Sequence, residues 1–332
     1  MMVDRSSSLE SLGRPEFWSD RRRTYARRAM RAGDNKTAYY LASQHYLTPD
    51  QNGFADLEWL SGYLALRKMD DPARAVWHFE NVRASIASPI SVGRAGYWLG
   101  RAYEGVGDSA KASASYALAA TYQTSFYGQL AAERAGLAPD HSIAAGDIPP
   151  DWTKADFLKS DSVRAAFLLH FAGEEMLTRR FLTHESESLS NPDRATIGQL
   201  ALDLGSPNTA LKIAKAAATN GDVITLAYYP VTELAEIDSP VPPELALAIA
   251  RQESEFNYAA QSPVGALGLM QVMPATGRDV AKDLGVSYST KRLGTDWEYN
   301  ARIGTAYLAQ MLKRYDGSTL LAAAAYNAGP HR

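Results

Sequence analysis

The chain has 332 residues, a length typical of two or three domains rather than one. Its 34 Lys and Arg residues nearly balance its 37 Asp and Glu residues, so the formal net charge is -3. This balance excludes a protein whose main purpose is electrostatic binding to nucleic acid or to an acidic membrane surface. The absence of cysteine excludes disulfides, thiol catalysis and cysteine-based metal sites.

The N-terminal segment predicts no export signal, because residues 1–6 turn polar at once. A basic helix follows, with six arginines between positions 21 and 31. A solvated helix face is the favoured interpretation of these arginines, and contact with an anionic glycan is the alternative. Further along, the longest apolar runs, 245–250 and 320–326, are too short to span a bilayer.

A repeat of 37 residues follows the basic helix. Asp34, Asp71 and Asp108 lie 37 residues apart, and each is predicted to begin a helix. Each helix carries a small residue at i+4 and a packing residue at i+8, which share one helix face. These six positions are Ala38, Ala75 and Ala112, and Ala42, Phe79 and Tyr116. The pattern resembles tetratricopeptide-type repeats and predicts a superhelix of helical hairpins over residues 1–150.

The repeat stops at a proline-containing stretch, 148–151. Helical patterns resume at 163–171 and 210–218 without the 37-residue period, which predicts a further helical region over 151–237. The strongest boundary is 238–244, Asp-Ser-Pro-Val-Pro-Pro-Glu, where prolines suit a linker and the start of a helix. A separate domain is therefore predicted over 238–332.

A helix is predicted over 244–256, and its first two turns are apolar all round, as in a buried helix. Glu255 has Arg251 at i−4, which predicts an ordinary structural ion pair. Glu253 has no basic neighbour at helical spacing, and it lies near the negative end of the helix dipole. Such a carboxyl is expected to have a raised pKa and to suit general-acid chemistry. On this helix alone, an exposed glutamate at a fraying end remains an equal alternative.

Two further segments suit a ligand site. Residues 262–276 form a loop in which glycines let a ligand approach the backbone and methionines offer an adaptable apolar floor. Gln271 is expected to bind a sugar amide or hydroxyl through paired hydrogen bonds. Residues 320–329 predict an alanine-rich helix that packs closely, places Tyr326 at one defined point and ends in an Asn327–Gly329 cap.

Together these segments carry a resemblance that none carries alone. The order Arg-Gln-Glu-Ser at 251–254, Ser-Pro-Val-Gly-Ala at 262–266, Gly-Leu-Met-Gln at 268–271 and Ala-Tyr-Asn-Ala-Gly at 325–329 closely resembles the soluble lytic transglycosylases of family 1. Larger members of this family of bacterial peptidoglycan-cleaving enzymes carry an α-superhelix before a lysozyme-like catalytic domain. The resemblance thus implies a mainly α fold with a superhelix of TPR-like hairpins and a lysozyme-like domain at 238–332.

The resemblance also implies a mechanism and a site. Glu253 is the single catalytic acid/base, and the reaction breaks the β-1,4 bond between N-acetylmuramic acid (MurNAc) and N-acetylglucosamine (GlcNAc) without water, which leaves a 1,6-anhydro end. Ordinary glycosidases need two carboxylates for this bond. The residues implied to line the saccharide groove are Ser262, Gln271, Met273, Thr276, Tyr307, Tyr326 and Asn327. No cofactor or metal is implied, the partner is a peptidoglycan strand, and the expected compartment is the periplasm.

The chain departs from the family at both ends. It stops at 330–332, directly after the Tyr-Asn-Ala-Gly motif, whereas the family continues with helices that complete the domain. It also lacks the export signal of a periplasmic enzyme. We therefore expect a fragment whose domain is truncated at its C-terminal end.

Two alternatives remain open on the sequence. A goose-type muramidase would hydrolyse the same bond, and it would need a second carboxylate in the groove. Asp279, Asp283, Asp296 and Glu298 lie outside the matching motifs. A non-catalytic helical-repeat scaffold would bind a protein or peptide along a concave face. The six histidines show no metal-ligand spacing and are interpreted as ordinary helix and loop residues.

Overall fold

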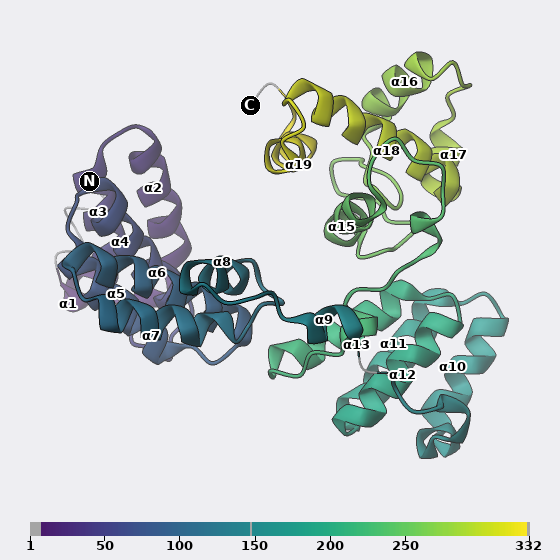
Figure 1. Ribbon diagram of the computed structural model, residues 1–332, viewed down its shortest axis with the longest axis horizontal. Coiled ribbons are helices and arrows are strands. Elements are labelled where there is room, and N and C mark those ends of the chain that lie inside the picture. The colour runs from purple at the N-terminus through teal and green to yellow at the C-terminus, as the bar shows by residue number, and fades with distance from the viewer. Residues whose placement is uncertain (1–7, 147, 331–332) are drawn as a thin grey trace. The chain divides into compact units, whose positions relative to one another are not determined.

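The computed structural model describes residues 8–146 and 148–330, and within these ranges the chain is mainly α-helical (Figure 1). The only β pairing in the described residues consists of the isolated bridges Gln261–Leu267 and Leu267–Val272. The chain divides into two compact units. The first comprises Met1–Ala145 with Ala218–Gly221, and the second comprises Gly146–Ala217 with Asp222–Arg332. His331 and the N-terminal residues 1–6 lie outside the described residues.

The first unit is a series of helices in which α2 to α8 each pack on their neighbours in sequence. Its long helices run from α2 to α8, with shorter ones at each end. The helices are α1 (Leu9–Leu12), α2 (Ser19–Arg31), α3 (Asn35–Ser43), α4 (Phe54–Lys68), α5 (Pro72–Ser85), α6 (Pro89–Val106), α7 (Ser109–Ala120), α8 (Phe126–Ala135) and α9 (His141–Ala145), with the 3-10 turn η1 (Pro15–Phe17).

The predicted repeat is confirmed in detail. Asp34, Asp71 and Asp108 are the N-caps of α3, α5 and α7, and each carboxylate accepts the backbone N–H three residues on, at 3.1, 3.0 and 3.0 Å. The residues predicted to pack at i+4 and i+8 are all buried. The 37-residue period therefore records one capped, inward-facing helix per hairpin.

Glycine sets the distance between the paired helices. A Cβ on Gly62 of α4 would lie 2.7 Å from the ring of Phe79 in α5, and one on Gly100 of α6 would lie 2.5 Å from the ring of Tyr116 in α7. Both contacts are shorter than any Cβ tolerates. The large residue at i+8 therefore needs a glycine opposite it, and the two hairpins repeat this arrangement.

The prediction of a solvated face for the basic helix α2 needs two corrections. Arg22 is buried, and its guanidinium donates to the carbonyl of Leu41 at 3.2 Å. Arg23 bridges Asp20 at 2.9 Å and Asp56. Arginines therefore tie α2 to α3 and α4, because an amphipathic stem lets a guanidinium reach polar groups across a packed interface.

Two of the histidines that were interpreted as ordinary helix and loop residues belong to a buried polar network. Glu58, on α4, is buried, and its two carboxylate oxygens lie 2.8 Å from His45 Nε2 and 2.8 Å from His78 Nδ1. Asn81 donates to the same carboxylate at 3.1 Å, and the hydroxyl of Tyr39 lies 2.7 Å from His78 Nε2. Residues far apart in sequence thus form one buried polar network, because tertiary packing supplies their partners.

The second unit begins with a further set of helices. Two of its helices were predicted, and they are observed as α10 (Asp161–Phe171) and α13 (Pro207–Thr219). Between them lie two helices that the sequence analysis missed, α11 (Glu175–Ser188) and α12 (Asn191–Asp203). Both helices are less apolar on average than α10 and α13, so they are less conspicuous in the sequence. Shorter elements are η2 (Trp152–Lys154), η3 (Asp156–Lys159), α14 (Thr225–Tyr228) and η4 (Glu233–Ala235).

The C-terminal part of this unit holds the predicted site. Its helices are α15 (Pro243–Ser254), α16 (Pro274–Asp283), α17 (Thr290–Thr295), α18 (Trp297–Arg314) and α19 (Thr319–Ala328). Helix α15 buries one face through Ala246, Ile249 and Ala250, whereas Ala248 is exposed, so the prediction of burial all round is wrong. None of the described helices combines the length and apolar composition needed to cross a membrane. The predicted boundaries at 150/151 and 237/238 stay predictions.

Candidate active site

Glu253 lies on the last turn of α15 and is half-buried. Burial raises the pKa of its carboxyl, because a low-dielectric surrounding disfavours the charged form. A hydrogen bond with the Asn327 side chain acts in the opposite direction but is the smaller effect. The shift has the direction that the sequence predicted. A raised pKa is the direction that suits a carboxyl for donating a proton.

The loop that follows α15 is fixed by polar side chains from two helices. Ser254 Oγ donates to the carbonyl of Leu269 at 2.6 Å. Asn300, fully buried on α18, accepts the backbone N–H of Met270 at 2.8 Å. Its amide also donates to the carbonyls of Leu267 and Leu293, at 2.8 Å each. The sequence analysis missed Asn300, whose signal was a polar residue on the apolar face of a helix.

Gly268 is required at the point where this loop passes Asn300. Its φ is +73°, and a Cβ would lie 2.4 Å from Asn300 Nδ2 and 2.6 Å from the carbonyl oxygen of Leu293. Gly265, in the same loop, has a φ of +90° but nothing within 4 Å of a Cβ. The two glycines therefore differ, because only Gly268 is needed for a close approach as well as for its backbone conformation.

Six of the residues implied to bind saccharide meet at one pocket of about 320 Å³. They come from the loop, from α16, from α18 and from α19. The residues lining the pocket are Gln271, Val272, Met273, Thr276, Tyr307, Tyr326, Asn327, Ala328 and Gly329. Glu253 adjoins it through its hydrogen bond with Asn327. Val272, Ala328 and Gly329 also line the pocket, although they were not among the residues implied to bind saccharide.

Tyr326 connects α19 to the loop and to α18 within the pocket. Its hydroxyl donates to the carbonyl of Met270 at 2.8 Å, and its ring centroid lies 5.3 Å from that of Tyr307. Burial raises the pKa of Tyr326, and the neighbouring Glu253 and Tyr307 raise it further. The phenol therefore stays protonated and keeps donating, so α19 remains fastened to the loop beside Glu253.

Three loop residues differ from the expectation. The Gln271 amide donates to the carbonyls of Ala260, at 3.1 Å, and Gly268, at 2.9 Å, so its N–H groups serve the loop rather than a free ligand site. Ser262 does not line the pocket, and its hydroxyl accepts the backbone N–H of Ala266 at 2.9 Å. Met270 is fully buried, which leaves Met273, 41% exposed, as the methionine of the apolar floor.

The predicted ion pair between Glu255 and Arg251 is wrong. Helix α15 ends at Ser254, and Glu255 turns away with a φ of 53°. Its carboxylate instead lies 2.8 Å from Lys212 Nζ and 2.5 Å from Lys215 Nζ, both on α13. Arg251 donates to the carbonyl of Tyr228 at 2.9 Å. The pairing failed because the i−4 rule holds only while the helix continues.

Two of the other carboxylates of this domain have structural partners. Asp296 caps α18 and pairs with Arg292 at 2.9 Å. Asp283 accepts from Gln310 at 3.1 Å and is exposed. The nine residues that line the pocket include neither Asp nor Glu. Among the residues that the structure describes, no cluster of three or more His, Cys, Asp or Glu side chains is arranged to hold a metal ion.

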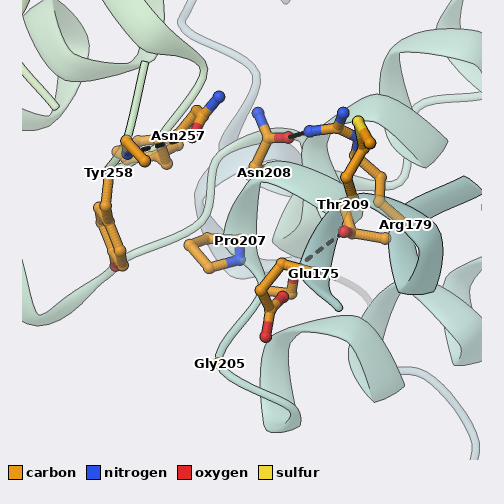
Figure 2. Close-up of a pocket in the computed structure, with 12 residues that line it drawn as sticks. Glu175, Arg179, Gly205, Pro207, Asn208, Thr209, Asn257 and Tyr258 are labelled. Carbon is orange, nitrogen blue, oxygen red and sulfur yellow. Dashed lines mark hydrogen bonds between the residues drawn. The ribbon is translucent and has the colours of Figure 1, made fainter. Parts of the chain in front are cut away.

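A second pocket, of about 500 Å³, lies beside the turn that follows α15 (Figure 2). Helices α11 and α13 form one side, and residues 256–259 form the other. Figure 2 shows Arg179 and Asn208 pointing toward each other, and the Arg179 guanidinium donates to Asn208 Oδ1 at 2.9 Å. No sequence motif indicated this pocket, because its walls come from segments about 50 to 80 residues apart.

In this chain an array of helical hairpins is followed by a small α-helical domain, and a half-buried glutamate lies at the end of that domain's first helix. Together these features define the class of helical superhelix with a lysozyme-like domain. The predicted fold class is thereby confirmed. Residues 232–332 match the family described as the Transglycosylase SLT domain. This part of the chain is therefore similar to the SLT domains of soluble lytic murein transglycosylases, and residues 232–332 are called the SLT domain below after this match.

Named relatives agree with this family. The chain is 41% identical over 108 residues to the soluble lytic murein transglycosylase of Escherichia coli (strain K12), an alignment that covers 32% of this chain and 17% of the relative. It is 43% identical over 90 residues to the membrane-bound lytic murein transglycosylase C of Photorhabdus laumondii, covering 26% of this chain and 25% of the relative. The chain thus aligns with a quarter or less of the length of these curated relatives.

Two solved structures share the fold over nearly the whole chain. An inactive mutant of the lytic transglycosylase Slt from Pseudomonas aeruginosa superposes with a TM-score of 0.71 at 24% identity, covering 99% of this chain and 54% of that one. The 70-kDa soluble lytic transglycosylase from Escherichia coli gives a TM-score of 0.59 at 22% identity, covering 93% and 54%. The chain therefore spans about half the length of both structures, and at these identities the likeness concerns the fold.

Proposed function

We propose that the protein is a peptidoglycan lytic transglycosylase that cleaves the MurNAc-β-1,4-GlcNAc bond without water and leaves 1,6-anhydro-MurNAc ends. The observation that carries the proposal is the half-buried Glu253, whose pKa is raised by burial, beside a pocket lined by the motif residues Tyr326 and Asn327. The SLT domain at 232–332 supports the same activity. The periplasm, where the polymer lies, is the proposed compartment.

In this mechanism one carboxyl acts twice. Glu253 donates its proton to the glycosidic oxygen while the bond from that oxygen to C1 of MurNAc breaks. The 2-acetamido group of MurNAc stabilises the positive charge that develops at C1. The ionised Glu253 then takes the proton of the C6 hydroxyl as that oxygen bonds to C1. The ring closes, the glutamic acid is restored, and no second carboxylate is needed to activate a water.

The pocket supplies the remaining parts. We assign Tyr307, Met273 and Thr276 to contacts with the sugar rings, and Asn327 to orienting the Glu253 carboxyl. Tyr326 holds the loop carbonyl of Met270 and keeps the wall of the pocket in place. Ser262 and Gln271 act through the shape of the loop, since both bond to its backbone.

Mass spectrometry of the soluble products from purified peptidoglycan tests the proposal. We expect muropeptides that end in 1,6-anhydro-MurNAc and are one water lighter than reducing-end products. Reducing-end products from the intact chain would instead establish a hydrolytic muramidase. Binding of peptidoglycan without any cleavage would favour a non-catalytic scaffold.

A further inference from the structure

The last turn of α15 is held from two sides by residues that precede the SLT domain. On one side, the Arg251 guanidinium lies over the rings of Tyr228, at 4.4 Å, and Tyr229, at 5.1 Å. On the other side, Lys212 and Lys215 of α13 hold the Glu255 carboxylate. Glu253 lies between Arg251 and Glu255 in sequence, so both contacts flank the proposed acid.

The turn that follows Glu253 is strained. Glu255 and Phe256 are consecutive non-glycine residues in the left-handed region, with φ of 53° and 61°. Each such residue costs roughly 1–2 kcal/mol relative to a right-handed conformation. Strain of this kind persists where the surroundings fix the backbone, and it concentrates at functional sites. The turn therefore depends on contacts made by its neighbours.

Those neighbours belong largely to α13. The Asn208 amide donates to the backbone carbonyl of Glu255 at 2.8 Å, and Phe256 is 2% exposed. Arg179, on α11, fixes the orientation of that amide by donating to its oxygen at 2.9 Å (Figure 2). Burial alone raises the pKa of Glu255, but the two ammonium groups outweigh it and lower the pKa, so the carboxylate stays charged and paired.

We propose that α13 is a positioning platform for Glu253, acting through Lys212, Lys215 and Asn208 on the turn after α15. The last turn of a helix lacks partners for its backbone carbonyls and frays unless it is held from outside. A general acid must stay within about 0.5 Å of its productive position. These three residues touch no reacting atom and are positioning residues. The inference rests on the proposed activity, and it adds that residues 232–332 need α13 for full rate.

The test compares the full chain with the double variant Lys212→Met/Lys215→Met, which keeps the apolar stems and removes both charges. A matched control is Lys154→Met/Lys159→Met, which removes two exposed lysines paired with Asp151 and Asp156 in the same unit. The substrate is a defined soluble fragment of two disaccharide units. We expect kcat to fall roughly tenfold with KM within about twofold, because a misplaced acid affects the transition state more than binding. The control is expected to match the unaltered chain.

Lys212→Arg/Lys215→Arg gives a second comparison, since arginine keeps both charges and is expected to restore kcat to within about threefold. Hydrogen exchange of residues 250–258 supplies a readout besides activity. We expect roughly tenfold faster exchange in the Met variant only. Unchanged kcat in the Met variant, or a loss confined to KM, would overturn the platform. If the unaltered chain were inactive, the proposed activity would be contradicted instead. The platform would still be rejected in that case if hydrogen exchange of residues 250–258 were unchanged in the Met variant.

Discussion

The hairpins of the first unit and the SLT domain are both built from short packed helices, yet they fix their polar side chains differently. In the hairpins, Asp34, Asp71 and Asp108 repeat one cap at one spacing. In the SLT domain, the single residue Asn300 fixes the loop at two points, Leu267 and Met270, and also bonds to Leu293 of α17. A repeated local rule is visible in the sequence, whereas a unique long-range contact is visible only in the fold.

The comparison also separates two kinds of buried carboxylate. Glu58, in the hairpins, is surrounded by His45, His78 and Asn81, and these hydrogen bonds outweigh the effect of burial. Glu253, in the SLT domain, has fewer partners, and burial dominates. Burial raises the pKa of both carboxylates, and the donors within reach decide the net direction: the pKa is lowered for Glu58 and raised for Glu253.

The largest expected effect is on the proposed acid. Glu253→Gln keeps the shape of the side chain and removes its transferable proton, so we expect cleavage to fall by at least about a thousandfold. Thermal unfolding is expected to stay within a few degrees of the unaltered chain, since a half-buried polar side chain is replaced by its isostere. Product release from peptidoglycan and a melting curve measure the two. A folded variant that keeps more than a few per cent of the activity would contradict the assignment.

Gly268→Ala tests whether the loop requires the close approach of Gly268 to Asn300. The new Cβ would overlap Asn300 and the Leu293 carbonyl, so we expect a loss of about 3 kcal/mol in the free energy of unfolding. Gly265→Ala is the control, with the same class of φ and open space, and we expect it to cost about 1 kcal/mol. Urea unfolding followed by circular dichroism measures both. Equal losses would show that the backbone conformation, and not the Asn300 contact, accounts for the loss in the free energy of unfolding.

Glu58 is expected to make the hairpins sensitive to acid. Its hydrogen bonds to His45, His78 and Asn81 lower the pKa to about 2 from 4.5, although burial opposes them. A carboxyl whose pKa is lowered by folding stabilises the fold at pH values above its pKa in the unfolded chain. This stabilisation is lost as the pH falls from about 5 toward about 2. The shift corresponds to roughly 3 kcal/mol. Unfolding at pH 7 and pH 3 measures about 2 kcal/mol of this loss, because the folded-state pKa of about 2 lies below pH 3, and Glu58→Gln is expected to reduce it.

Glu16→Gln is the matched control, because its ion pair with Arg14 is exposed. We expect it to change the free energy of unfolding by less than about 1 kcal/mol. If both variants showed the same pH dependence, the buried network would contribute nothing particular to acid stability.

The pH dependence of cleavage tests the assignment of Glu253 as the initial acid. Burial raises the pKa of Glu253, so the acid is protonated at low pH and loses its proton as the pH rises. We expect kcat/KM to fall about tenfold for each pH unit above that pKa. A rate profile against a defined fragment measures it. A rate that rises with pH over the same range would identify a group that must be ionised first and would contradict Glu253 as the initial acid.

The smallest effect concerns the repeated caps. Asp71→Ala removes the acceptor for the N–H of Arg74 and is expected to cost about 1 kcal/mol. Asp34→Ala and Asp108→Ala are expected to cost the same within about 0.5 kcal/mol, because the cap geometry is repeated. Urea unfolding of the three variants compares them. Costs that differ by more than about 2 kcal/mol would mean that the period does not mark equivalent positions.

The sequence by itself determined the local and periodic features of this protein. Asp71 as a cap and Phe79 as a buried residue follow from local spacing, and both were predicted. The direction of the pKa shift of Glu253 was also predicted, but its cause is burial, which only tertiary packing supplies. Tertiary structure decided the partners of Glu255 and Glu58. Lys212 lies 43 residues from Glu255, and His78 lies 20 residues from Glu58. Helical spacing cannot supply such pairs, because only packing brings distant charges within hydrogen-bond distance.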